Sequence, residues 1–356
     1  MKFFDTSPEY KILKENILER VSKVLNEGNF ILGSEVLELE RKLERYVGTK
    51  HVITCGNGTD ALVLALKALG ISAGDAVFCP TFTYFASAES IVNAGATPVF
   101  VDVDKGTFNI CCNDLEKKIK ETIKEKKQHP KAIMPVDLFG LPANYPEIRS
   151  IAEKHDLKII EDGAQGFGGE IGSQKACSFG DISTTSFFPT KPLGCYGDGG
   201  AVFTDSDEYA EIIRSLRSHG SGKDKYDNVR IGMNSRLDTL QAAILLEKLK
   251  YFEIELNNKT MLASNYNDRF GDQYIVPYIP KHYKSSWAQY TLRVEDREKV
   301  VKKFISEGIP TMIYYKKCLH LQKAFSYLGY KYGDFPNSEE LTKTVLSIPM
   351  QGYLHA

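Results

Sequence analysis

The chain has 356 residues, of which 42% are hydrophobic and 26% are charged, a composition typical of a folded protein with one large and one smaller domain. Lys and Arg total 45 and Asp and Glu total 46, so the formal net charge is only −1. Because proteins that bind nucleic acid through its phosphates usually carry a basic excess, this balance argues against nucleic acid as the main partner.

Neither a membrane association nor a metal site is expected. No apolar run approaches the roughly 18 residues that cross a bilayer, and the first residues lack the apolar core of a signal peptide. No His and Cys residues have the spacing of metal ligands. The seven cysteines are scattered along the chain, which indicates reduced thiols in a cytoplasmic protein.

Two amphipathic helices are predicted first, at Pro8–Glu27 and Gly33–Tyr46. From about residue 50 to residue 205, short apolar runs then alternate with helical segments. This alternation is typical of an α/β fold with a mostly parallel sheet between helices. The seven expected strands are His51–Cys55, Ala76–Pro80, Pro98–Asp102, Ala132–Leu138, Lys158–Glu161, Ile182–Phe188 and Gly200–Thr204.

The remainder of the chain is predicted to form a long helix and a second α/β layer. The helix is expected over Leu237–Leu256, with Asn234 and Ser235 ahead of it as a cap signal. The small layer is expected from Tyr290–Val294, Glu298–Glu307 and Thr311–Tyr315. We therefore expect a large domain over residues 1–250 and a smaller C-terminal domain over residues 251–356.

A glycine-containing segment, Cys55–Leu62, joins the first expected strand to a helix. Small residues allow close backbone approach, and the start of a helix presents unpaired N–H groups, so Gly58 and Thr59 are candidates for holding a phosphate. The spacing matches neither the Walker nor the Rossmann fingerprint. Taken alone, the segment fits a plain tight turn as well as it fits a phosphate site.

An acidic residue follows a second apolar strand, in the segment Ile159–Gln165. Asp162 lies where a parallel strand ends, which is where open α/β sheets place their ligands. The alternative is an aspartate that caps the next turn.

A lysine, Lys191, follows a third strand in a loop rich in proline and glycine. Burial would lower its pKa and make its amine nucleophilic, whereas an ordinary surface lysine is the alternative. Together, a phosphate cup, a strand-end acid and a loop lysine occur in the order used by one class of enzymes that bind pyridoxal 5′-phosphate (PLP). An aldehyde cofactor needs an amine to hold it. Its pyridine nitrogen needs a carboxylate beside it, and its phosphate needs N–H donors.

Five motifs in order resemble those of the DegT/StrS family of nucleotide-sugar aminotransferases, which have the type I fold of PLP-dependent transferases. The resemblance covers about Phe30 to Tyr353. The motifs are Asn57–Leu62, Pro80–Tyr84, Glu161–Gln165, Ser186–Lys191 and Asn234–Asp238. One stretch departs from the family: Tyr315–His320 keeps the tyrosine and the histidine of a Tyr-Pro-x-Pro-x-His pattern but neither proline.

The resemblance implies a role for each cofactor residue. Lys191 would hold PLP as a Schiff base and shuttle protons, Asp162 would pair with the pyridinium nitrogen, and Gln165 would lie near the ring hydroxyl. The other implied contacts are Gly58, Thr59 and Ser186 to the phosphate, Tyr84 and Ala164 to the two faces of the ring, and Asn234 to the phosphate of a neighbouring subunit. The expected unit is a homodimer with a shared active site.

The expected reaction moves an amino group from L-glutamate to a keto sugar linked to UDP or dTDP, for surface glycans such as the lipopolysaccharide O-antigen. The segments Phe187–Gly200 and Asn234–Leu246 most resemble the branch that aminates carbon 3. Candidate substrate contacts are Arg230, Tyr314, Tyr315 and His320, each with a structural or surface role as the alternative. Amination at carbon 4, a PLP-dependent dehydratase, racemase or lyase, and a non-catalytic PLP sensor remain open.

Overall fold

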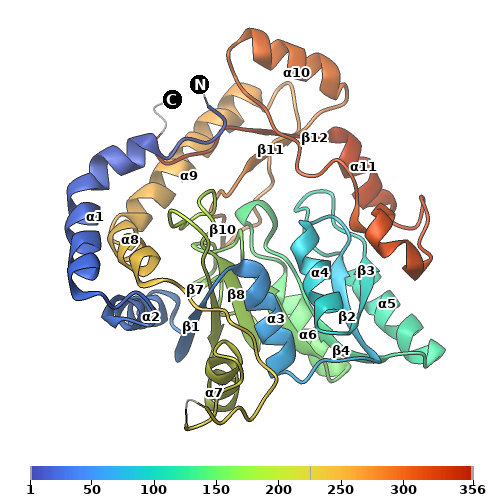
Figure 1. Cartoon of the computed structure of the whole chain (residues 1–356). Helices are drawn as coiled ribbons and strands as arrows, with labels where there is room; N and C mark the ends of the chain where they lie inside the picture. The colour runs from blue at the N-terminus through green and yellow to red at the C-terminus, as the bar shows by residue number, and fades with distance from the viewer. Residues whose placement is uncertain (1, 225, 354–356) are drawn as a thin grey trace.

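The computed structural model describes residues 2–224 and 226–353, so the last three residues of the expected C-terminal domain lie outside the described residues. At its centre is the predicted seven-stranded sheet (Figure 1). Its strands are β1 (His51–Cys55), β2 (Asp75–Pro80), β3 (Thr97–Val101), β4 (His129–Ile133), β5 (Lys158–Asp162), β8 (Ile182–Ser186) and β9 (Gly200–Thr204).

The strand order is β1-β9-β8-β5-β4-β2-β3. The neighbours from β8 to β3 pair in parallel, and only β9 runs antiparallel to the strands on either side of it. The carboxyl ends of β1, β2, β5 and β8 therefore lie on one edge of the sheet. Ligands of open α/β sheets bind at this edge.

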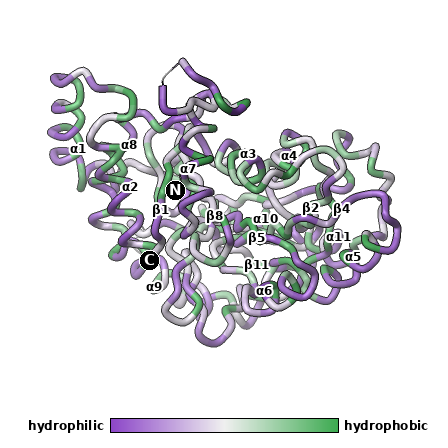
Figure 2. Tube along the Cα trace, turned by 90° about the horizontal axis from the view of Figure 1, so that it is seen from below, coloured by the Kyte–Doolittle hydropathy of each residue, from purple (hydrophilic) through white to green (hydrophobic). Residues whose placement is uncertain are grey.

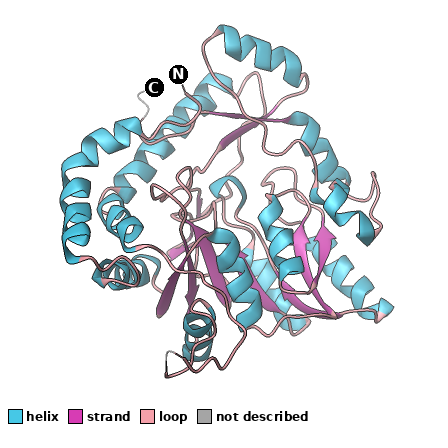
Figure 3. Ribbon diagram, in the orientation of Figure 1, coloured by secondary structure: helices cyan, strands magenta, loops and turns pink. Residues whose placement is uncertain are grey.

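Helices cover both faces of the sheet (Figure 3). One core layer packs beneath α3 (Gly58–Ala68), α4 (Phe85–Asn93) and α7 (Asp207–Leu216), and a second beneath α5 (Cys112–Glu125) and α6 (Tyr145–Lys154). Hydrophobic segments run through the middle of the molecule and hydrophilic ones follow the outer loops (Figure 2). The sheet strands are almost wholly buried, as expected for parallel strands covered on both sides.

The two N-terminal helices also form as predicted, as α1 (Ser7–Glu27) and α2 (Ser34–Val47). The long helix expected over Leu237–Leu256 is instead divided into α8 (Thr239–Leu249) and α9 (Phe252–Phe270). At the break, Tyr251 packs toward α1 and Phe252 packs into the core under α2, so adjacent aromatic side chains enter different core clusters.

Two expected strands have different bounds. The strand predicted over Ala132–Leu138 is β4, which ends at Ile133 because Pro135 has no N–H to continue the ladder. In the segment Thr311–Tyr315 only Met312 makes a bridge, with Ser347, so no strand forms. The strand prediction failed there because Tyr314 and Tyr315 pack instead with a core cluster that includes Phe82 and Val103.

The C-terminal part contains α10 (Arg297–Ser306), α11 (Pro336–Thr344) and a two-stranded sheet of β11 (Tyr290–Arg293) and β12 (Val345–Ile348). α10, β11 and β12 share a core with the second half of α9, whereas Leu341 of α11 packs with Phe82 and Val103. A further small sheet joins β10 (Tyr283–Lys284), β6 (Glu170–Ile171) and β7 (Gln174–Lys175). The domain division at residue 250 stays a prediction.

Within the described ranges, none of the helices is both long enough and apolar enough to cross a membrane.

Candidate active site

Three of the predicted segments meet at the carboxyl edge of the sheet. Asp162 is the last residue of β5 and Ser186 the last residue of β8, and the two strands are direct neighbours. Gly58 begins α3 directly after β1. A side-chain carbon placed on Gly58 would lie 2.6 Å from Cβ of Ser186, so only glycine permits this approach. The topology therefore joins residues that are far apart in the sequence.

The start of α3 is arranged to hold an anion. The side-chain oxygen of Asn57 accepts a hydrogen bond from the N–H of Asp60 at 2.8 Å, and the backbone carbonyl of Asn57 accepts one from the N–H of Ala61 at 3.1 Å. The first N–H groups of a helix have no partner within it, so those of Gly58 and Thr59 are left to a ligand at the positive end of the helix. Ser186 adds a hydroxyl beside them. This grouping suits a phosphate.

Asp162 is buried, and each of its carboxylate oxygens accepts one hydrogen bond. Its Oδ2 accepts the hydroxyl of Ser87 at 2.7 Å, and its Oδ1 accepts the N–H of Ala164 at 3.3 Å. Burial raises the pKa of the Asp162 carboxyl, while the Ser87 hydroxyl and the nearby charge of Lys191 oppose that rise. A cationic ring nitrogen beside this carboxylate would be strongly favoured.

Lys191 lies in the loop after β8, where its N–H donates to the carbonyl of Phe188 at 2.8 Å. Burial lowers the pKa of the Lys191 amine, and the nearby carboxylate of Asp162 only partly offsets this effect. A lower pKa leaves more of the amine uncharged near neutral pH, as a nucleophile toward an aldehyde requires. The Lys191 side chain is only partly exposed, so it differs from a fully solvated surface lysine, and its role as the Schiff-base residue stays a prediction.

Gln165 and two tyrosines line the next part of the site. The amide oxygen of Gln165 accepts the N–H of Phe139 at 2.6 Å, and its amide nitrogen donates to the Tyr315 hydroxyl at 3.2 Å. The rings of Tyr84 and Tyr315 have centroids 6.3 Å apart. Tyr84 is 59% exposed, so its ring is open to a ligand in the described chain.

The remaining predicted residues are placed elsewhere. Arg230 donates to the hydroxyl of Ser215 at 3.3 Å near the end of α7, and Asn234 is exposed and accepts from Arg236 at 2.6 Å. Tyr314 packs between Phe3 and Tyr315. Contacts of Arg230 and Asn234 with a neighbouring subunit stay predictions.

His320 differs most from the expectation of a substrate contact. It is 2% exposed, and its two ring nitrogens lie 2.8 Å from Oγ1 of Thr81 and 3.2 Å from Oε1 of Glu339. In this structure neither nitrogen is free for a substrate. These surroundings fit the alternative role named for His320, which is a structural one.

Two features of the site escaped sequence reasoning. Ser87 looks like any serine in a helix, and only the tertiary position of α4 brings its hydroxyl to Asp162 at the end of β5. Asp137 and Glu161 form a buried carboxyl pair next to Asp162 in the sheet. The acidic Glu161 was visible in its motif, but its distant partner Asp137 was not.

An amine beside a buried carboxylate, with an anion site within the same sheet edge, meets the needs of a PLP enzyme, so fold and site define a PLP-dependent aminotransferase. The chain belongs to the DegT/DnrJ/EryC1/StrS aminotransferase family, whose model matches residues 11–355. The resemblance seen in the sequence is confirmed.

Three relatives illustrate what the chain is similar to. It is 41% identical over 355 residues to the UDP-2-acetamido-2-deoxy-3-oxo-D-glucuronate aminotransferase of Pseudomonas aeruginosa, covering 99% of this chain and 96% of the relative. It is 41% identical to a pleiotropic regulatory protein of Geobacillus stearothermophilus (97% and 92% covered). It is 39% identical to the UDP-N-acetyl-3-dehydro-alpha-D-glucosamine 3-aminotransferase of Acidithiobacillus ferrooxidans (97% and 91% covered).

Solved structures agree with the fold. A DegT/DnrJ/EryC1/StrS aminotransferase from Brucella abortus is 48% identical with a TM-score of 0.97, and 100% of this chain and 95% of that chain are covered. NtdA from Bacillus subtilis, 30% identical with a TM-score of 0.89 over 99% and 81% of the chains, was solved with the bound cofactor PMP, the amino form of PLP.

The residues present fit PLP. Lys191 and Asp162 are near enough for each charge to change the pKa of the other, and the close approach of Gly58 to Ser186 forms a small cradle at the start of α3. When bound, PLP supplies an aldehyde that receives an amino group and a ring that withdraws electrons. The chain would hold its phosphate at Gly58, Thr59 and Ser186 and its ring nitrogen at Asp162.

Proposed function

We propose that this enzyme transfers the amino group of L-glutamate to carbon 3 of a keto sugar linked to UDP or dTDP. The observation that carries the proposal is the position of Lys191, close enough to the buried Asp162 carboxylate for their charges to interact, at the sheet edge where Gly58 approaches Ser186. Aminotransfer requires an amine and a carboxylate placed together in this way. The names of the 3-oxo-sugar aminotransferases from P. aeruginosa and A. ferrooxidans support carbon 3. The product would enter surface glycans such as the O-antigen.

The roles assigned by resemblance belong to this proposal. Lys191 moves protons between the reacting carbons, Gln165 binds near the ring hydroxyl with Tyr315 holding its amide, and Tyr84 and Ala164 lie on the two faces of the ring. Tyr314, Tyr315 and Arg230 are proposed to contact the sugar nucleotide. These assignments rest on position, and the hydrogen bond from Gln165 to Tyr315 links the cofactor and substrate parts of the site.

We further propose a homodimer in which Asn234 of one subunit completes the phosphate site of the other. The exposure of Asn234, and of the apolar side chains of Val229 (53%) and Ile231 (89%) in the same loop, supports contact with a second copy. The cytoplasm is the proposed compartment, which the seven unpaired cysteines support.

The test has two stages. The protein is first loaded with PLP and mixed with L-glutamate; loss of the yellow colour in the wild type but not in Lys191→Ala is expected. The glutamate-treated enzyme is then offered UDP- and dTDP-linked 3-oxo and 4-oxo sugars, and the products are analysed by mass spectrometry and NMR.

Each outcome separates one alternative. An amine at carbon 4 would overturn the assignment of carbon 3, and loss of water from the sugar would indicate a dehydratase. A yellow wild-type protein that is indifferent to every amino donor and sugar would indicate a non-catalytic PLP sensor; the Geobacillus relative is named as a regulatory protein.

A further inference from the structure

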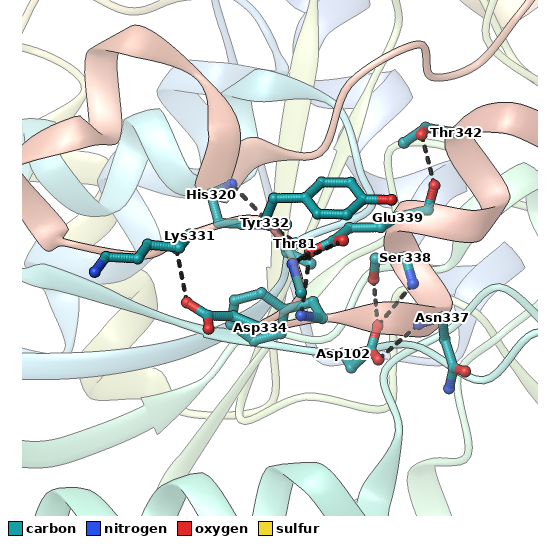
Figure 4. A network of polar contacts seen from close by, with 12 residues as sticks. Thr81, Asp102, His320, Lys331, Tyr332, Asp334, Asn337, Ser338, Glu339 and Thr342 are labelled. Atoms are coloured by element: carbon teal, nitrogen blue, oxygen red, sulfur yellow. Dashed lines mark hydrogen bonds and ion pairs between the residues drawn. The ribbon is translucent and has the colours of Figure 1, made fainter.

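A polar network joins the C-terminal part of the chain to the edge of the sheet that holds the site (Figure 4). At its centre is the imidazole of His320, which lies between Thr81, just beyond β2, and Glu339 of α11. All three side chains are buried, with exposed fractions of 0% for Thr81, 2% for His320 and 4% for Glu339. A buried imidazole with two polar partners has a defined orientation.

The hydrogen bonds fit a neutral imidazole that carries its proton on Nε2. Oγ1 of Thr81 accepts the backbone N–H of His320 at 3.1 Å, so its own hydrogen is free to be donated to Nδ1, 2.8 Å away. Nδ1 is then an acceptor, and Nε2 carries the proton that is donated to the Glu339 carboxylate. The neutral imidazole protonated at Nε2 satisfies every partner in the chain.

Glu339 is a rigid anchor for this arrangement. Its carboxylate also accepts the N–H of Gly333 at 2.8 and 2.9 Å, through its two oxygens, and the N–H of Phe335 at 3.4 Å. These bonds order the turn before α11 around a single carboxylate. The position of His320 is therefore set by a helix that lies outside the large sheet.

Thr81 transmits this position to the site. Its carbonyl accepts the N–H of Leu319 at 2.8 Å, and its N–H donates to Val101 of β3 at 3.0 Å. The three residues that follow lead to Tyr84 and into α4, whose Ser87 holds the Asp162 carboxylate. The loop that begins at Thr81 therefore leads to Tyr84, a predicted cofactor contact, and then to Ser87, which donates a hydrogen bond to Asp162.

We propose that His320, as the neutral imidazole protonated at Nε2, is a positioning residue that joins Glu339 to Thr81 and thereby fixes the loop after Thr81 and the start of α4 against the cofactor site. It touches neither cofactor nor substrate. This inference rests on the proposed function, because the site that it positions is the proposed PLP site.

Three carboxylates lie near the imidazole of His320. Burial lowers the pKa of His320, and the carboxylates of Glu339, Asp334 and Asp102 only partly oppose this effect. Because the folded-state pKa is below the ordinary 6.5, folding favours the neutral form, and its contribution is complete above that pH. Stability is expected to fall as the pH decreases below 6.5, where the unfolded chain binds the proton first.

The chain offers a matched control within the same network. Asp102, at the end of β3, accepts the N–H of Ser338 at 2.8 Å and its hydroxyl at 2.6 Å, and this contact also docks α11. It does not pass through Thr81. Ser338→Ala should therefore loosen α11 without moving the loop, whereas Thr81→Val and His320→Gln remove the contact between loop and imidazole.

The experiment compares these three variants and His320→Asn, all loaded with PLP. Visible circular dichroism of the bound cofactor and the single-turnover rate with L-glutamate are measured beside the melting temperature. Thr81→Val and His320→Gln should reduce both the dichroism and the rate, the rate about tenfold, as expected for one lost buried hydrogen bond. His320→Asn, which keeps an acceptor in the place of Nδ1, should restore part of both signals.

A second measurement uses the protein without PLP. Urea unfolding of the wild type between pH 5 and pH 8 should show the loss of stability below 6.5, and His320→Asn should show less of it. The proposal is overturned if Thr81→Val leaves the dichroism and rate unchanged, if Ser338→Ala changes them as much, or if the two unfolding profiles are parallel. If the wild type itself ignores glutamate and every other donor, the proposed function fails, while the unfolding profiles still judge the state of His320.

Discussion

At the residue scale, the charge of Asp162 is maintained by a hydroxyl from another element. Ser87 donates to Oδ2 of Asp162 at 2.7 Å in a buried setting. Without this donor, burial would raise the pKa of the carboxyl further and weaken its attraction for a protonated ring nitrogen. Sequence alone assigned Asp162 but could not assign its partner.

We therefore predict that Ser87→Ala lowers the turnover rate by about tenfold or more, because a hydrogen bond to a charged group contributes roughly 1.5–3 kcal/mol. Ser90→Ala is the control, since Ser90 is also buried on α4 but donates only to the carbonyl of Ser87 at 3.0 Å. Rates with L-glutamate at saturating PLP are measured for both. Equal rates in the two variants would contradict a specific role for Ser87.

A second prediction concerns the carboxyl pair behind the site. Oδ1 of Asp137 accepts the N–H of Ala143 at 3.0 Å and the Tyr145 hydroxyl at 2.9 Å, whereas Oδ2 has no conventional donor and faces Glu161. Glu161 is already hydrogen-bonded by Phe179 and Ser183 at 2.7 Å. Burial raises the pKa of Asp137, so we infer that Asp137 keeps a proton and donates it to Glu161.

The sign of the pH dependence follows from this raised pKa. The unfolded chain loses the proton above about pH 4, near the ordinary value of 3.8, while the folded chain keeps it. The stabilisation is complete below that pH and declines as the pH rises toward the folded-state pKa. Asp137→Asn replaces the proton by an amide N–H that does not titrate. The free energy of unfolding, measured in urea, should therefore rise in Asp137→Asn relative to the wild type as the pH increases from 5 to 8. If the difference between the two proteins stays constant over this range, the shared proton is refuted.

At the scale of elements, a buried ion pair joins α2, β1 and the end of α7. Nη1 of Arg217 donates to Oε1 of Glu40 at 2.8 Å and to the carbonyl of Thr54 at 2.7 Å. Both charged side chains are buried, with exposed fractions of 6% for Arg217 and 5% for Glu40. Removal of one partner from such a pair leaves a buried charge without compensation.

Arg217→Met should therefore lower the free energy of unfolding by about 3–5 kcal/mol. The exposed Arg41, which follows Glu40 on α2, provides the control. Arg41→Met should change the free energy of unfolding by no more than about 0.5 kcal/mol. Urea unfolding followed by circular dichroism measures both. A loss in Arg217→Met as small as in the control would mean that the ion pair contributes little to stability.

At the scale of the whole molecule, the proposed dimer would bury apolar side chains that the single chain exposes. Ile231 is 89% exposed in the loop before Asn234, and Ile31 and Phe30 are 47% and 45% exposed beside the start of α8. We predict that Ile231→Asp converts dimers to monomers and weakens PLP binding at least tenfold, because a charge in an apolar interface is costly.

Sedimentation and PLP titration test this prediction. Ile305→Asp is the control, because Ile305 is 65% exposed on α10 in the C-terminal part. It should leave both the mass and the PLP affinity unchanged. A wild-type monomer with full PLP affinity would remove the basis for a shared site.

Whole-molecule architecture was accessible to sequence reasoning because it depends on local patterns. Apolar runs separated by helical segments specified the seven strands, and the strand bounds erred mainly at Pro135, whose effect on the ladder is itself local. The division of the long helix at Tyr251 depended on two separate core clusters and could not be read from a periodic pattern.

The sequence by itself determined the chemistry at Lys191, Asp162 and Gly58, because an amine, an acid and a glycine each have properties that hold in any fold that brings them together. Only the tertiary structure decided how these groups are supported. Three contacts join segments that are distant in the chain: Ser87 with Asp162, His320 with Thr81, and Asp137 with Glu161. Burial and hydrogen-bond partners determine protonation, and both exist only after long-range packing has formed.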